Sequence, residues 1–387
     1  MQAPPSATLR AAQAIELSDV KPLALTLGDP AGIGPEIVAK ALAHDAILRD
    51  QVVVVGDARV LADALARYAP EFRVLPVNLR DALPELHEHD IALHAVPSLD
   101  TLSALPTLGK VSAEAGRAAY DAIVEAAQLS LDGHTCGLST APINKLALRA
   151  AGIREPGHTE ILARMAGLAG SNHFAMMFAS EQLQVVLATI HLPLSEALAA
   201  LTPKLIFEKI QLTHEAGIWL GKVNPKIAIA GINPHAGEGG MLGSDEQRVL
   251  VPAIAKARAH GFNVTDPLPP DTVFMRARSG EFDVVLAMFH DQGLIPVKLL
   301  GLDRAVNVTI GLPFLRSSVD HGTAFDIAGK GVASEANLLH VLRWHLARVQ
   351  APAQQRVGSG RDLFTRAQDE RKTLSTTQLW PPNSPSR

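Results

Sequence analysis

The sequence predicts an α/β fold in which helices cover both faces of parallel sheets. Short runs of Val, Ile, Leu and Ala alternate with longer amphipathic segments, and this alternation is typical of parallel α/β proteins. The runs lack a polar residue at every second position, as expected for strands buried on both faces. With 387 residues, 47% of them apolar, the chain can fill two or three domain cores.

The expected elements follow one another in order. The first strand is KPLALTLG, and a helix begins near Pro35 because proline fits the first helical turn. The strand QVVVVG with the helix RVLADALARYA, and the strand CGLSTAP with the helix INKLALRAAG, come next. The later strands are QVVLATIH, KIAIAGINPH and FDVVLAMFHDQG, separated by the helical segments PLSEALAALTPKLIFEKIQLTHEAG and DEQRVLVPAIAKARAHG. Residues 1–20 and 349–387 are polar and aperiodic, so we expect both ends to be weakly ordered.

The composition argues against several classes of function. A formal net charge of −4 and an aromatic content of 4% give no reason to expect nucleic acid or an anionic membrane as a partner. A single cysteine, Cys136, excludes an intramolecular disulfide and a cysteine-based metal centre within one chain. The sequence contains neither a signal-peptide pattern nor an apolar run of about 18 residues. We therefore expect a cytoplasmic protein.

Three expected strands end at or just before a histidine, namely His191, His235 and His290. Ligands of open α/β sheets bind beyond the carboxyl ends of the strands. Each histidine alone could be structural, but together they form a candidate metal site, assembled by the fold or by two subunits. Three imidazoles leave positions on a divalent ion where a hydroxyl or water can lose its proton. Asp291 could orient an imidazole or cap a helix.

Cationic and polar residues after the last of these strands indicate an anion site. Arg316 offers a planar fork suited to carboxylate or phosphate, and Lys298, near a metal, could accept a proton. Both could equally be solvated surface groups. In GHTE, Thr159 could cap a helix while His158 faces the crevice, or the motif could be a helix cap only. Lys145 also follows an apolar strand and could reach the crevice.

The stretch LGDPAGIGPEI is neither a Rossmann fingerprint nor a P-loop, because its glycines fall at positions 28, 32 and 34 and no Lys-Ser/Thr follows. Gly28, Gly32 and Gly34 permit a positive φ and the close approach of a ligand or another backbone. A purely structural turn between strand and helix explains the same residues.

Several motifs together resemble the 4-hydroxythreonine-4-phosphate dehydrogenase family of vitamin B6 synthesis. They are LTLGDPAGIGPEIVAKAL, GHTE, INPHAGEGG, MFHDQG followed by PVK, and VNVTIGLPFLRSSVDHGTAFDIAGKG. GIGPE and DIAGKG are also similar to isopropylmalate and isocitrate dehydrogenases. The resemblance implies a two-domain α/β/α subunit with a cleft between the domains. The first, cofactor-side domain would comprise residues 21–145 and 280–348, and the second, at the dimer interface, residues 146–279.

The resemblance also implies a homodimer with a shared active site, a divalent metal (Zn, Mg, Mn or Co), and NAD or NADP. It places the metal ligands on His191, His235 and His290. The implied substrate contacts are His158, Thr159, Lys298, Asn307 and Arg316, with Lys298 as the leading catalytic proton acceptor. The implied cofactor contacts are Gly28, Gly32, Gly34, His321, Gly322, Thr323 and Asp326.

The implied activity is oxidation of the secondary hydroxyl of a phosphorylated four-carbon hydroxy acid, followed by decarboxylation. Asn144-Lys145, where the B6 branch tends to have His-Lys, is more similar to the branch acting on D-threonate or D-erythronate 4-phosphate. A dihydrodiol dehydrogenase of terephthalate breakdown is a third relative. From other classes, a three-histidine metal hydrolase would lack G-x-S-x-G and H-E-x-x-H and leave DIAGKG unexplained, and a silent ligand-binding protein would not need the full residue set.

Overall fold

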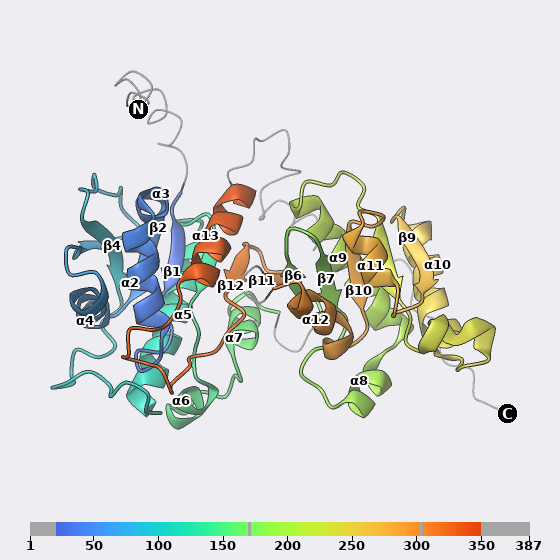
Figure 1. Cartoon of the computed structure of the whole chain (residues 1–387), viewed down its shortest axis with the longest axis horizontal. Helices are drawn as coiled ribbons and strands as arrows, with labels where there is room; N and C mark the ends of the chain where they lie inside the picture. The colour runs from blue at the N-terminus through green and yellow to red at the C-terminus, as the bar shows by residue number, and fades with distance from the viewer. Residues whose placement is uncertain (1–20, 169–171, 302–304, 350–387) are drawn as a thin grey trace, which may run out of the picture.

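One sheet of twelve strands runs through the part of the chain that the computed structural model describes, residues 21–168, 172–301 and 305–349 (Figure 1). The expectation of weakly ordered ends lies outside these residues, apart from Val349. The strands are β1 (Leu23–Thr26), β2 (Val52–Gly56), β3 (Arg73–Val77), β4 (Asp90–Ala95), β5 (Leu138–Thr140), β6 (Ala175–Ala179), β7 (Gln184–Leu187), β8 (Ile227–Ala230), β9 (Val264–Leu268), β10 (Val284–Ala287), β11 (Val306–Ile310) and β12 (Arg316–Ser318). Their order across the sheet is β3-β4-β2-β1-β5-β12-β11-β6-β7-β10-β8-β9.

The predicted α/β class is confirmed, but the sheet is mixed at its centre. The outer strands of each half pair in parallel, whereas β11 is antiparallel to both β12 and β6, and β6 is antiparallel to β7. The parallel strands of the two halves therefore run in opposite directions. In Figure 1 the orange β11 and β12 lie between the blue first half and the green second half.

Helices cover both faces of this sheet. They are α2 (Gly34–His44), α3 (Ala46–Gln51), α4 (Ala58–Tyr68), α5 (Ala113–Leu131), α6 (Lys145–Ala150), α7 (His158–Met165), α8 (Leu194–Ala200), α9 (Pro203–Trp219), α10 (Val251–Ala259), α11 (Val273–Arg278), α12 (His290–Leu299) and α13 (Ala336–Val349). Alternate strand residues point to opposite faces: Leu23 and Leu25 share a core with α2, α4 and α13, whereas Ala24 packs in the core that holds α5, α6 and α7. In the second half, α9 and α10 cover one face and α11 and α12 the other.

The position of β10 bears on the expected domain boundary at residue 280. β10 pairs in parallel with β7 on one side and β8 on the other. Residues 284–287 therefore lie among strands of the range expected to form the second domain, and the chain returns to the first half only through β11 and β12. No helix among the described residues is long and apolar enough to cross a membrane.

Candidate active site

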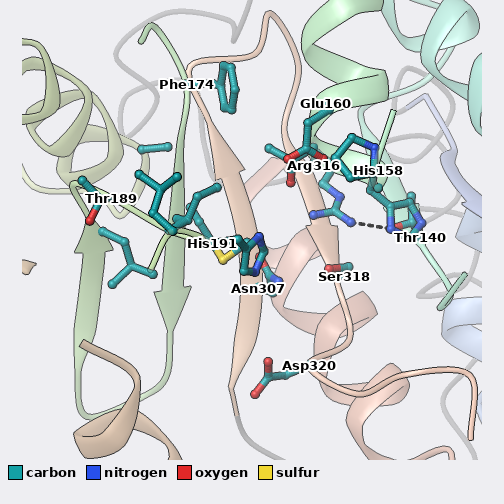
Figure 2. Close-up of a pocket in the computed structure, with 18 of the residues that line it drawn as sticks. Thr140, His158, Glu160, Phe174, Thr189, His191, Asn307, Arg316, Ser318 and Asp320 are labelled. Atoms are coloured by element: carbon teal, nitrogen blue, oxygen red, sulfur yellow. Dashed lines mark hydrogen bonds between the residues drawn. The ribbon is translucent and has the colours of Figure 1, made fainter. Parts of the chain in front are cut away.

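A cavity of about 840 Å³ lies at the centre of the sheet, where the two halves meet (Figure 2). Its walls come from β5, α7, β6, β7, α9, β11, β12 and the segments next to them. The structure brings the following predicted site residues to this cavity: His158, Thr159, His191, Asn307, Arg316, His321 and Gly322. Residues that lie far apart in the sequence therefore share one site.

Arg316 is a buried cation on β12. Its Nη1 donates to Oγ1 of Thr309 at 3.1 Å, and its Nη2 donates to Oγ1 of Thr140 at 2.8 Å. Burial lowers the pKa of Arg316 to about 9, against a smaller raising effect of Glu160. Its Nε, also buried, has no hydrogen-bond partner among the described residues. The guanidinium is thus charged at neutral pH and retains a donor for an anion.

His158 begins α7 and lies beside Arg316 in Figure 2. Burial, and next the charge of Arg316, hold the pKa of His158 well below its usual value, so the imidazole is neutral. Within the described structure its buried Nε2 has no partner, and neither has Oδ1 of Asn307. Buried polar atoms are nearly always hydrogen-bonded in native proteins, so these atoms indicate a missing ligand.

The three predicted metal ligands follow neighbouring parallel strands, β7, β10 and β8. The ring centres of His191 and His290 lie 5.6 Å apart. Burial, together with Lys145 and His290, lowers the pKa of His191, which favours the neutral imidazole that binds metals. Oδ1 of Asp291 lies 2.7 Å from Nδ1 of His290, so Asp291 does orient that ring.

His235 does not join the other two histidines. It is exposed, in a turn over Pro234–Gly240 whose backbone is left-handed, with φ of 51° at His235 and 43° at Glu238. Across the described ranges, no group of three His, Cys, Asp or Glu residues is close enough to hold a metal ion. The structure thus brings together two of the three predicted ligands.

Buried Glu246 fixes the base of this turn. Its Oε1 accepts hydrogen bonds from the backbone N–H groups of Ile232 and Asn233, at 2.9 and 2.7 Å. Gln292 links the same region to β10, because its Nε2 donates to the carbonyl of Gly231 and its Oε1 accepts from the N–H of Met288, both at 2.7 Å.

Lys298 forms an ion pair with a carboxylate that lines the cavity. Its Nζ lies 3.2 Å from Oδ2 of Asp320, which lines the cavity at the end opposite Phe174 in Figure 2. Burial raises the pKa of Asp320. The pair can therefore exchange a proton with a ligand.

The glycine loop packs against the protein's own backbone. A Cβ on Gly28 would lie 2.4 Å from the carbonyl oxygen of Pro142, and one on Gly34 would lie 2.3 Å from that of Leu27. A Cβ on Gly32 would lie 2.9 Å from Cβ of Thr323. These contacts require glycine whether or not a ligand binds.

The same contacts join the two predicted cofactor segments. The N–H of Ile33 donates to the carbonyl of Thr323 at 3.0 Å. Thr323 is buried and Asp326 is exposed.

Sequence reasoning did not assign three residues that the cavity contains, Thr140, Lys209 and Asp320. Thr140 ends an expected strand, and Asp320 precedes His321 in a motif already noted, so their positions offered a signal. Lys209 lies inside an amphipathic helix, where a lysine normally faces solvent, and nothing in the sequence distinguishes it.

Comparison with known proteins supplies the family. The family model described as "Pyridoxal phosphate biosynthetic protein PdxA" matches residues 48–344. The chain belongs to this family. It is 50% identical over 317 residues to a 4-hydroxythreonine-4-phosphate dehydrogenase of Beijerinckia indica, covering 82% of this chain and 92% of that protein. It is 43% identical over 333 residues to a D-threonate 4-phosphate dehydrogenase of Cupriavidus necator, covering 84% and 97%.

A solved structure supports the same family. The crystal structure of 4-hydroxythreonine-4-phosphate dehydrogenase from Klebsiella pneumoniae matches with a TM-score of 0.78 and 41% identity, covering 85% of this chain and 100% of that one. The resemblance found in the sequence is confirmed, as is the predicted enzyme class, an oxidoreductase acting on a CH–OH group.

Proposed function

We propose that this PdxA-family protein is a metal-dependent NAD(P) dehydrogenase that oxidises the secondary hydroxyl of a phosphorylated four-carbon hydroxy acid of the 4-hydroxythreonine 4-phosphate type. The observation that carries the proposal is the unpartnered Nε of Arg316 beside neutral His158, in a cavity that also holds His191. A buried cation without a carboxylate partner is a binding site for a substrate anion. The names of the relatives support a phosphorylated hydroxy acid as that substrate.

Two of the three histidines predicted to bind a divalent ion are placed to do so. His191 and His290 would hold it, and their ring separation of 5.6 Å is close to the roughly 5 Å that two imidazoles bound at about 2.1 Å to one ion would have. His235 would be the third ligand after a change in its turn or from a second subunit. A bound divalent ion would favour loss of the hydroxyl proton, and the nicotinamide would accept the hydride.

The chain's own residues would hold the substrate and move the proton. Arg316 Nε would donate to an anionic group. Because neutral His158 already hydrogen-bonds to the backbone of Ala141, its Nε2, like Oδ1 of Asn307, would accept a hydrogen bond from a substrate hydroxyl or amine. Lys298 would relay the hydroxyl proton: its Nζ would give a proton to Oδ2 of Asp320, 3.2 Å away, and take up the hydroxyl proton in its place. Oxidation next to the carbon that bears the carboxylate gives a β-keto acid, which can lose carbon dioxide.

Two other features of the proposal, the homodimer and the cofactor site, rest on separate observations. The exposed leucines at positions 192, 194 and 198, beside His191, support a homodimer whose interface borders the site. The contact between the loop at Ile33 and Thr323 supports a cofactor site that both segments share.

D-threonate 4-phosphate is the second candidate substrate. Asn144, the residue that suggested this branch, caps α6, with its Oδ1 accepting from the N–H groups of Leu146 and Ala147. Lys145, next to it, lines the cavity. The side chain of Asn144 therefore caps the helix. Of the two residues, Lys145 is the one that would contact a ligand in the cavity.

A substrate panel tests the proposal. Purified protein with Zn²⁺, Mg²⁺, Mn²⁺ or Co²⁺ would be offered NAD or NADP with 4-hydroxythreonine 4-phosphate, D-threonate 4-phosphate, D-erythronate 4-phosphate and a terephthalate cis-dihydrodiol. We expect cofactor reduction with a phosphorylated member, abolished by EDTA. Reduction with the dihydrodiol alone, or with none of the four, would overturn the proposal.

A further inference from the structure

Lys209, in the middle of α9, lies in the wall of the cavity. Its side chain is 6% exposed. Its Nζ donates to the carbonyl oxygens of Asn172 at 3.0 Å and Phe174 at 2.6 Å, just before β6. The protein therefore holds an ammonium group inside the same cavity as Arg316.

This ammonium has no anionic partner in the described part of the chain. No carboxylate oxygen there lies within ion-pair distance of Nζ, and Glu208, which precedes it, faces Lys204 instead, with Oε1 at 4.0 Å from that Nζ. Burial lowers the pKa of Lys209 to about 8. An ammonium has three N–H donors, and the two carbonyls use two of them. One donor therefore remains for a ligand, and the nearby charge of Glu208, which raises the pKa of Lys209, offsets only part of the effect of burial.

Lys209 is separate from the anion site at Arg316. Arg316 projects from β12 beside α7, in the first half of the sheet, whereas Lys209 holds the segment that leads into β6. Figure 2 shows Phe174, one of the two carbonyl partners, apart from Arg316 and at the opposite end from Asp320. The cavity thus offers two buried cations to one ligand.

We propose that Lys209 binds a second anionic group of the substrate, at the Phe174 end of the cavity, while Arg316 binds the first. This inference rests on the proposed function, because a phosphorylated hydroxy acid carries a phosphate and a carboxylate. Each anion would then meet its own buried cation. The enzyme would select ligands with charge at both ends and discriminate against those with charge at one end.

The test compares Lys209→Met and Lys209→Gln with a matched control, Lys204→Met, on the same helix but with a side chain 76% exposed. Glutamine is one bond shorter than lysine, but it keeps two N–H donors for the carbonyls and removes the charge and the third donor. Calorimetry would give the Kd of the substrate found by the panel, of its analogue without phosphate, and of its analogue without carboxylate. We expect both Lys209 variants to bind the substrate about 10- to 100-fold more weakly, with KM affected more than kcat, and Lys204→Met to change Kd less than twofold.

The two analogues identify which group Lys209 binds. The analogue that retains this group should lose affinity in the variants, and the other should not. Unchanged Kd values in Lys209→Gln for the substrate and both analogues would overturn the inference.

Two further measurements separate this inference from stability effects and from the proposed function. In the wild type, bound ligand should protect Lys209 but not Lys204 from acetylation, read by mass spectrometry; equal labelling with and without ligand would count against the inference. If no member of the panel is turned over, binding of inorganic phosphate still tests Lys209: weaker binding in Lys209→Gln would support the anion site while the proposed reaction fails, and equal binding would reject both.

Discussion

Replacing Arg316 with methionine should stabilise the ligand-free protein while abolishing ligand binding. Burial lowers the pKa of Arg316 to about 9, and at roughly 1.4 kcal/mol per pKa unit keeping this charge in the folded protein costs about 5 kcal/mol. The hydrogen bonds to Thr140 and Thr309 offset about 1 kcal/mol each. Methionine fills a similar volume without a charge, so the free energy of unfolding should rise by about 3 kcal/mol.

The pH dependence gives this prediction a second, independent readout. Because the folded-state pKa of Arg316 is lowered, the unfolded chain holds one more proton over a pH window that begins at about 9. The stability of the wild type therefore rises with pH across this window, relative to a chain without the arginine. The advantage of Arg316→Met should be full at pH 7 and should shrink as the pH rises above about 9.

Urea unfolding of the two proteins, at pH 7 and at pH 10, measures both effects. With substrate present, the wild type should gain stability and Arg316→Met should not, because loss of a buried partner of an anion costs about 2–5 kcal/mol of binding. A variant less stable than the wild type at pH 7, or one that ligand stabilises equally, would refute the reasoning about an unpaired buried charge.

Three further changes follow from the site. Glu246→Ala should lower the free energy of unfolding by about 1–3 kcal/mol, because the partly buried N–H groups of Ile232 and Asn233 lose their acceptor; chemical denaturation would measure this, and a loss below about 0.5 kcal/mol would show that the turn does not depend on the carboxylate. Gly34→Ala should cost about 1–3 kcal/mol through the clash with the carbonyl of Leu27, and a melting temperature equal to that of the wild type would contradict the close approach. Asp291→Asn should weaken metal binding about 10- to 100-fold by releasing the ring of His290, as titration with Zn²⁺ or Co²⁺ would measure; unchanged affinity would remove this pair from the metal site.

Several strands of the parallel halves could be predicted because their apolar runs are local signals, whereas β3, β4 and β9 were not among the expected strands. LALT, VVVVG, VVLA and IAIA all form strands where the composition indicated them. The antiparallel centre could not be predicted, because β6 and β11 pair across more than a hundred residues of chain and a period-two pattern carries no information on direction. The same holds for β10, whose neighbours are set by the order of strands and not by their sequence.

The same distinction between local signals and long-range packing applies to the residues of the candidate site. His191 and His290 were predicted to meet because both follow strands, and strand ends are visible in the sequence. The exposure of His235 depends on a left-handed turn whose strain no periodicity reveals, although the glycines of HAGEGG allow it. Lys209 was invisible because its burial comes from the packing of α9 over the segment before β6, a contact between distant parts of the chain.

Gln292 connects the ends of β8 and β10, the strands that His235 and His290 follow. One amide holds the carbonyl of Gly231, after β8, and the N–H of Met288, after β10. A displacement of one end is therefore transmitted to the other, and His290 cannot drift away from the base of the turn that carries His235. Insertions in the turn that carries His235 should be tolerated only where they leave both hydrogen bonds of the Gln292 amide intact. Gln292 is therefore the first residue to substitute in order to change the distance between His235 and His290.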